Sequence, residues 1–130
     1  VDVSDERAIQ NTPETMAHLG LTYKMDLFNG LLMINGNLSH RGDIVQFEVP
    51  APIIDQEAYT LYNLGAVWIS DDNRWSVGLH GKNLGDKEFK TAGYCFGTTG
   101  DCPLALGLED NTTIFYGPPR TVTATVEYRF

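Results

Sequence analysis

Long apolar segments are absent from this sequence of 130 residues. A transmembrane helix needs about 18 to 20 consecutive apolar residues, and no such run occurs. The first ten residues, VDVSDERAIQ, also lack the basic region and the apolar region that make up a secretory signal peptide. The length allows one domain at most. No helical membrane span is therefore expected within these residues.

Positive charge is also scarce. Lysine and arginine number 9 against 17 aspartates and glutamates, which gives a net charge of −8. A nucleic-acid-binding surface needs a basic patch to neutralise phosphates, so we expect no nucleic-acid partner. The acidic residues fall mostly in segments that we expect to be loops, where solvated carboxylates are common. The charge pattern therefore indicates exposed loops rather than a ligand site.

Catalytic motifs are missing as well. The sequence contains no glycine-rich phosphate loop, no HExxH and no GxSxG. Ser39 and His40 are adjacent, and neighbouring side chains of a strand point to opposite faces, so they cannot form a catalytic pair. His18, His80 and a loop carboxylate leave a metal site open as an alternative, but solvated histidines on a polar face are the favoured interpretation. We expect no enzyme, no cofactor and no metal site.

Only two cysteines are present, Cys95 and Cys102, and both lie in one stretch rich in glycine and threonine. A metal site would need more ligands nearby than Asp101. We therefore predict a local Cys95–Cys102 disulfide, which is typical of an oxidising compartment such as the periplasm or the cell surface.

What the sequence does have is strict alternation near its end. One face carries Val122, Ala124, Val126, Tyr128 and Phe130, and the other carries Thr121, Thr123, Thr125, Glu127 and Arg129. This period of two predicts a β-strand with one apolar and one polar face. About ten residues is also the length at which a tilted strand crosses a bilayer, and aromatic residues at the ends of an apolar stripe are typical of lipid-facing strands.

The same pattern predicts five antiparallel strands, at residues 14–26, 31–41, 57–70, 75–89 and 118–130. Asn29-Gly30 is a strong hairpin signal between the first two strands. Connections at 26–30 and 71–74 are short, whereas those at 42–56 and 91–117 are long. The alternation of short turns and long loops is typical of outer-membrane β-barrels. Asn35, Asn37 and Ser39 on the second strand suit the lining of a water-filled lumen.

Two motifs carry a resemblance to a known family. KNLGDKEF at 82–89 and GPPRTVTATVEYRF at 117–130 resemble the C-terminal part of the β-barrel domain of a TonB-dependent outer-membrane receptor. The resemblance implies a segment of a large barrel of about 22 strands in the outer membrane of a Gram-negative bacterium. It also implies active uptake of a scarce nutrient, of the siderophore-iron, cobalamin or carbohydrate class, powered through TonB. Five strands cannot close such a barrel, so we expect the chain to be a piece of a longer, processed or split protein.

The implied partners are the rest of the barrel and its plug, the barrel-assembly machinery, the TonB complex, outer-membrane lipid and a small nutrient molecule. In this family the final strand signals to the assembly machinery, which assigns that role to Phe130, Tyr128, Val126 and Val122; as an alternative, Phe130 and Tyr128 are only membrane-interface anchors. The long loops suggest ligand contacts at Phe47, Tyr94, Phe96, Phe115 and Tyr116, unless these rings pack loop on loop.

A different class of protein stays open. In a soluble antiparallel β-sheet binding domain, the Leu/Val/Ala face would be buried in a core. The loop closed by Cys95 and Cys102 would then be the recognition element.

Overall fold

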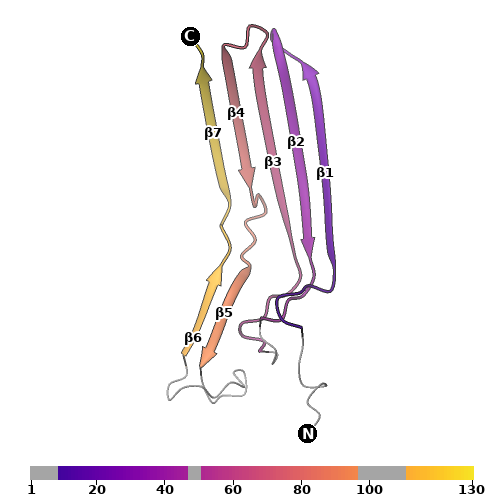
Figure 1. Ribbon diagram of the computed structural model, residues 1–130, viewed down its shortest axis with the longest axis vertical. Helices are drawn as coiled ribbons and strands as arrows, with labels where there is room; N and C mark the ends of the chain where they lie inside the picture. The colour runs from indigo at the N-terminus through magenta and orange to yellow at the C-terminus, as the bar shows by residue number, and fades with distance from the viewer. Residues whose placement is uncertain (1–8, 47–50, 97–110) are drawn as a thin grey trace. The chain divides into compact units, whose positions relative to one another are not determined.

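The computed structural model describes residues 9–46, 51–96 and 111–130. Together these residues form an all-β, antiparallel structure (Figure 1). The strands are β1 (Met16–Asp26), β2 (Gly30–Arg41), β3 (Tyr59–Ser70), β4 (Trp75–Lys82), β5 (Lys90–Phe96), β6 (Asn111–Tyr116) and β7 (Thr121–Tyr128). Within the described ranges, no helix is long and apolar enough to cross a membrane.

The chain divides into two compact units. One comprises Ala17–Ser39, Thr60–Lys87 and Pro118–Phe130, and it contains a five-stranded sheet of order β1-β2-β3-β4-β7. The five strands lie side by side in a single layer (Figure 1). The other unit comprises Val1–Met16, His40–Tyr59 and Glu88–Gly117, and its strands β5 and β6 pair with each other.

The five strands of the sheet follow the five predicted segments in order, but one predicted end is wrong. The strand predicted at 75–89 stops at Lys82. Asn83 and Asp86 adopt left-handed backbone conformations, with φ of 49° and 51°. The Asn83 side chain also accepts the Lys87 N–H at 3.0 Å. This side-chain turn satisfies the backbone locally, so the strand cannot continue.

The prediction of one long loop at 91–117 is also wrong at its two ends, which are strands. β5 and β6 pair from Lys90↔Tyr116 to Phe96↔Asn111, with a bulge between Lys90 and Ala92. The Thr, Ile, Phe and Tyr residues of β6 favour a strand. The abundance of glycine and threonine in the whole stretch concealed this short pair.

The hairpin between β1 and β2 lies where Asn29-Gly30 predicts it. Its two left-handed residues are Phe28 and Asn29, each with φ of 53°, and the Leu27 N–H donates to the Gly30 carbonyl at 2.8 Å. A pair of left-handed central residues matches the right-handed twist of the flanking strands. Gly30 has a different role, because a Cβ there would collide with the Ile69 carbonyl and the Trp68 ring.

The turn between β3 and β4 is held by side chains. The Ser70 hydroxyl donates to Asp72 at 2.5 Å, and the Arg74 N–H donates to the same carboxylate at 3.1 Å. These bonds, with the nearby Arg74 charge, lower the pKa of Asp72 below its ordinary value of 3.8. The polar turn predicted at 71–74 therefore forms, and Ser70 and the Asp72 carboxylate stabilise it.

All buried hydrophobic residues of the described chain lie in the unit that contains β5 and β6. They are Ile44, Ala51, Ile54, Tyr59 and Phe89. Ile54 is fully buried and packs with Ala51 and Ile114, while the rings of Tyr59 and Phe89 stack at 4.7 Å. The ammonium of Lys90 donates to the carbonyls of Ile53 and Asp55. This unit therefore has a small core of its own.

Candidate functional site

The five-stranded sheet has two unlike faces, and its register shows how they arise. Partners across β3, β4 and β7 form apolar rows, such as Ala66↔Leu79↔Ala124 and Trp68↔Val77↔Val126. The row Gly65↔His80↔Thr123, next to the first of these, belongs to the other face. Because directly opposed residues point the same way, the alternation in each strand adds up to one continuous apolar face.

The apolar face of this sheet is exposed. Leu79 at its centre is 54% exposed, Val126 is 69% exposed, and Leu21 on β1 is 74% exposed. None of the hydrophobic residues in this unit's described part is buried. Monomeric soluble proteins rarely expose apolar patches of more than a few hundred Å². The exposed apolar face therefore needs to be covered, either by a non-aqueous phase or by another layer of protein.

Aromatic rings gather at the end of β4 and β7 nearest the short turns. Trp75 and Tyr128 are cross-strand partners with ring centroids 4.7 Å apart, and Tyr128 contacts Phe130 edge-on at 5.1 Å. Tyr62, 49% exposed, lies on β3 toward the other end of the apolar face. The stripe is thus flanked by rings that have both an apolar body and, in Trp and Tyr, a polar group.

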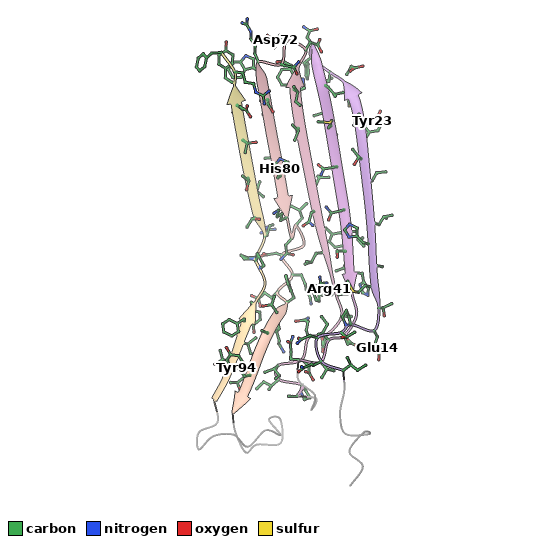
Figure 2. All side chains as sticks on the ribbon, in the orientation of Figure 1. Glu14, Tyr23, Arg41, Asp72, His80 and Tyr94 are labelled. Atoms are coloured by element: carbon green, nitrogen blue, oxygen red, sulfur yellow. The ribbon has the colours of Figure 1, made fainter. Side chains whose placement is uncertain are left out.

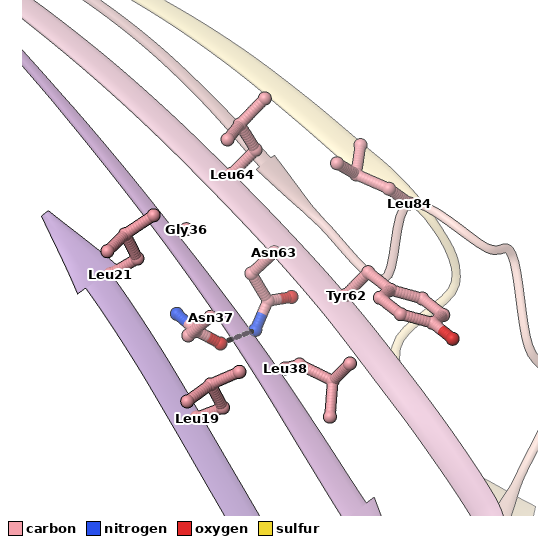
Figure 3. A pocket seen from close by; sticks show the side chains of 9 residues that line it. All are labelled: Leu19, Leu21, Gly36, Asn37, Leu38, Tyr62, Asn63, Leu64 and Leu84. Carbon is pink, nitrogen blue, oxygen red and sulfur yellow. Dashed lines mark hydrogen bonds between the residues drawn. The ribbon is translucent and has the colours of Figure 1, made fainter. Parts of the chain in front are cut away.

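A shallow hollow of about 340 Å³ interrupts the apolar face (Figure 3). It lies where Gly36 provides no side chain, and it is bordered by Leu19, Leu21, Leu38, Tyr62, Leu64 and Leu84. A Cβ on Gly36 would make ordinary contact with Leu64 at 3.6 Å. The hollow is therefore a local dip in a leucine surface rather than an enclosed cavity.

The opposite face is lined by amides, hydroxyls and an imidazole. Asn63 donates from its side chain to the Asn37 side-chain oxygen at 2.7 Å. His80, labelled in Figure 2, lies between two glycines: a Cβ at Gly65 would be 2.9 Å from its Nδ1, and one at Gly78 would be 3.2 Å from its Nε2. The glycines allow the ring to lie against the sheet. This face can be solvated without leaving polar groups unpaired.

The four residues predicted to form an assembly signal are all exposed. Val122, Val126 and Tyr128 share the apolar face of β7, and Phe130 follows the strand. β7 is an edge strand of the sheet, so one row of its backbone groups is available for pairing. The signalling role stays a prediction.

The aromatic residues predicted as loop contacts are only partly brought together. Tyr94 on β5 and Phe115 on β6 meet edge to face at 5.7 Å. Gly93 and Ile114, their neighbours, turn the other way toward Ile54. Tyr116 is exposed opposite Lys90. Tyr94 and Phe115 therefore stand on the outward face of the β5–β6 pair, and a ligand contact there stays a prediction.

Four predicted residues, Phe47, Cys95, Phe96 and Cys102, have no described side chain. Phe47 and Cys102 lie outside the described residues, and Phe96 is placed only by its backbone in β5. Cys95 is opposite Thr112 in the β5–β6 pair. The Cys95–Cys102 disulfide stays a prediction. In the described ranges, no group of three or more His, Cys, Asp or Glu side chains could hold a metal ion.

Two contacts that the sequence pattern does not reveal join the motif segments 82–89 and 117–130. Asn83 donates to the Pro118 carbonyl at 3.1 Å, and the Arg120 N–H donates to Asp86 at 3.1 Å. Only the shared presence of Asn, Asp and Arg in these segments hinted at such pairing.

Comparisons with protein-family models, curated proteins and solved structures find no match to this chain.

Proposed function

We propose that this chain is a wall segment of a large outer-membrane β-barrel, in a transporter similar to TonB-dependent receptors. The exposed apolar face of the five-stranded sheet carries the proposal. In a membrane barrel, apolar residues face lipid while alternating polar residues face the lumen. The rows across β3, β4 and β7 follow that division except at Val67 and Ile69, which lie in polar rows opposite Gly78 and Ser76.

The lengths of the strands support a bilayer location. β2 and β3 have 12 residues each. At about 3.4 Å per residue and a tilt of about 40°, such a strand crosses about 30 Å, which is close to the thickness of the hydrocarbon core. β4 and β7 are shorter, but their pairing is prolonged by the Arg129 N–H, which donates to the Arg74 carbonyl at 2.8 Å.

The edges of the sheet support a segment of a larger barrel. β1 and β7 each have one neighbour in the described sheet, so each leaves a row of backbone groups for a further strand. The remaining barrel strands would supply that pairing. Outer-membrane lipid would cover the apolar face, and the assembly machinery would engage β7 before the barrel closes.

The transport role rests on the resemblance of residues 82–89 and 117–130 to the receptor family. By that resemblance, the full protein takes up a scarce nutrient of the siderophore-iron, cobalamin or carbohydrate class, driven through TonB. This chain would contribute wall, and its β5–β6 pair would contribute an aromatic surface at Tyr94 and Phe115.

The competing proposal is a soluble β-sheet binding domain, and the two differ in what contacts Val126. Spin labels at Val126→Cys and at its neighbour Thr125→Cys test this, in native membranes containing the complete protein. If Val126 faces lipid, the label at Val126→Cys should collide readily with oxygen and poorly with a water-soluble nickel complex. The label at Thr125→Cys, on the polar face, should show the reverse preference.

A label at Val126→Cys that is shielded from both reagents would indicate a soluble core and would contradict the proposal. Recovery of the native protein as a detergent-free soluble species would contradict it as well. The two labelled positions are adjacent on one strand, so differences in depth or local motion are small between them.

A further inference from the structure

The pairing of β4 with β7 raises a question of register. Eight residue pairs match, from Trp75↔Tyr128 to Lys82↔Thr121, yet residues 83–120 separate the two strands. In a tight hairpin the turn fixes the register, whereas here the connection is long, and its own pairing begins at Lys90↔Tyr116, several residues beyond the ends of β4 and β7. Alternation does not select the register either, because a slip of two residues keeps every side chain on its face. Some other feature must set it.

Asn83 provides one half of such a feature. It is 5% exposed, and its side-chain nitrogen donates both to the Lys87 carbonyl at 2.9 Å and to the Pro118 carbonyl at 3.1 Å. Its side-chain oxygen accepts the Lys87 N–H. One buried amide thus holds the departing end of the connection and its returning end together, next to the last matched pair of the two strands.

Asn83 is itself held by the sheet. Its backbone N–H donates to the Asn63 side-chain oxygen at 2.9 Å, and Asn63 in turn donates to Asn37 at 2.7 Å. The Leu84 N–H donates to the Tyr62 carbonyl at 2.9 Å. These hydrogen bonds connect Asn37 on β2, Asn63 on β3 and Asn83 at the end of β4. Asn83 therefore has a fixed position from which it contacts Pro118.

Asp86 provides the other half. Its carboxylate accepts the Arg120 N–H at 3.1 Å, and the Arg120 guanidinium lies 3.8 Å from its second oxygen. Asp86 has a left-handed backbone conformation, and its N–H donates to the Asn83 carbonyl at 2.8 Å. This hydrogen bond closes the turn that begins at Asn83. Both contacts reach the residues immediately before β7 begins.

We propose that Asn83 and Asp86, acting on Pro118 and Arg120, form a register clamp that positions β7 on β4. A slip of two residues moves β7 by about 7 Å along β4. Such a shift is larger than either hydrogen-bond length, so both contacts break in every slipped register. The clamp replaces the missing tight turn, and it does so whether lipid or a protein layer covers the apolar face.

The clamp also separates the sheet from the long connection. Residues 88–117 leave and return at points joined by the Asn83 side chain and by the Gly117 N–H, which donates to the Phe89 carbonyl at 2.9 Å. Changes of conformation or length between those points therefore do not alter the β4–β7 register.

Cross-linking tests this in the complete protein. Val77→Cys combined with Val126→Cys reports the native register, because these residues are direct partners. Val77→Cys combined with Ala124→Cys or with Tyr128→Cys reports a slip of two residues. After oxidation in the membrane, mass spectrometry identifies the joined positions. The ratio of native to slipped product is the readout.

Adding Asn83→Ala with Asp86→Ala should lower this ratio about tenfold, because two specific hydrogen-bonded contacts are lost. Asp72→Ala is a matched control, since Asp72 also accepts a backbone N–H from an arginine and lies near its guanidinium, but within the β3–β4 turn. It should leave the ratio unchanged.

If the double variant does not assemble, Asp86→Ala alone decides, because its side chain is half exposed and its removal opens no cavity. It should lower the ratio about threefold. A ratio equal to that of Asp72→Ala would overturn the register clamp.

Discussion

Gly30 lies in the turn that the Asn29-Gly30 pair predicts, but the structure needs glycine there for a different reason from the expected one. Asn-Gly predicts a turn because glycine adopts left-handed conformations easily. Here the left-handed residues are Phe28 and Asn29, and Gly30 instead lets the chain approach Trp68, whose indole N–H donates to the Leu27 carbonyl at 2.8 Å. The absence of a Cβ, rather than backbone freedom, is what this position needs.

Gly30→Ala should therefore lower the free energy of unfolding by about 1–3 kcal/mol, because the added methyl collides with a ring and a backbone carbonyl. Gly20→Ala is the control. A Cβ at Gly20 meets nothing within 4 Å, so that variant should be neutral or stabilised by up to about 1 kcal/mol. Urea unfolding followed by tryptophan fluorescence measures both. Equal destabilisation of the two variants would contradict the close-approach argument.

Elements differ in how much of them the sequence predicts. The strands β1, β2 and β7 follow from a period of two that is complete within each segment. The end of β4 does not, because it depends on Asn83 contacting Lys87 and Pro118. β5 and β6 are hidden for the same reason: each is short, and their stability comes from pairing with each other and from packing on Ile54.

The candidate surface divides in the same way. Its apolar and polar faces could be predicted, since alternation alone assigns each residue of β7 to a side. The position of His80 between Gly65 and Gly78 could not, because it requires the register of two strand pairs. Contacts between residues distant in the chain are the part that a single sequence conceals.

The unit that contains β5 and β6 should depend strongly on one side chain. Ile54 is 0% exposed, whereas its neighbour Ile53 is 39% exposed. Ile54→Ala should destabilise this unit by about 2–5 kcal/mol through lost contacts and a residual cavity. Ile53→Ala, the same substitution one residue earlier, should cost about 1 kcal/mol or less.

Hydrogen exchange locates the effect. The Ile44 and Gln56 amides, which are bonded to each other's carbonyls, should lose protection in Ile54→Ala. Amides of the paired strands β4 and β7 should keep theirs, because they belong to the other unit. Equal losses in both variants, or a loss that extends to β4 and β7, would show that this core does not stabilise its unit independently.

At the scale of the whole molecule, burial and exposure are distributed unequally between the two units. One has a small conventional core around Ile54, whereas the sheet of the other exposes apolar side chains of β1, β3, β4 and β7. For a protein in water the second arrangement is unfavourable by about 25 cal/mol for each Å² of apolar surface. In a bilayer the same surface is in contact with hydrocarbon, and the cost disappears. The proposed membrane location thus accounts for the exposed apolar face of the sheet.

If the apolar face of the sheet contacts lipid, the free-energy cost of introducing a charged side chain should be larger on that face than on the polar face. Ala124→Arg places a cation at the centre of the apolar face of β7, and Thr123→Arg places the same side chain one residue earlier on the polar face. At the midplane of a bilayer, a lipid-facing arginine costs about 2–4 kcal/mol. Ala124→Arg should therefore reduce the amount of folded protein in the outer membrane severalfold, while Thr123→Arg should leave it near the parent level. Heat-modifiable mobility on gels measures the folded fraction. Uptake per folded molecule should not change in Ala124→Arg, because Ala124 faces away from the lumen. Similar losses for both substitutions, or a larger loss for Thr123→Arg, would mean that the apolar face does not meet lipid.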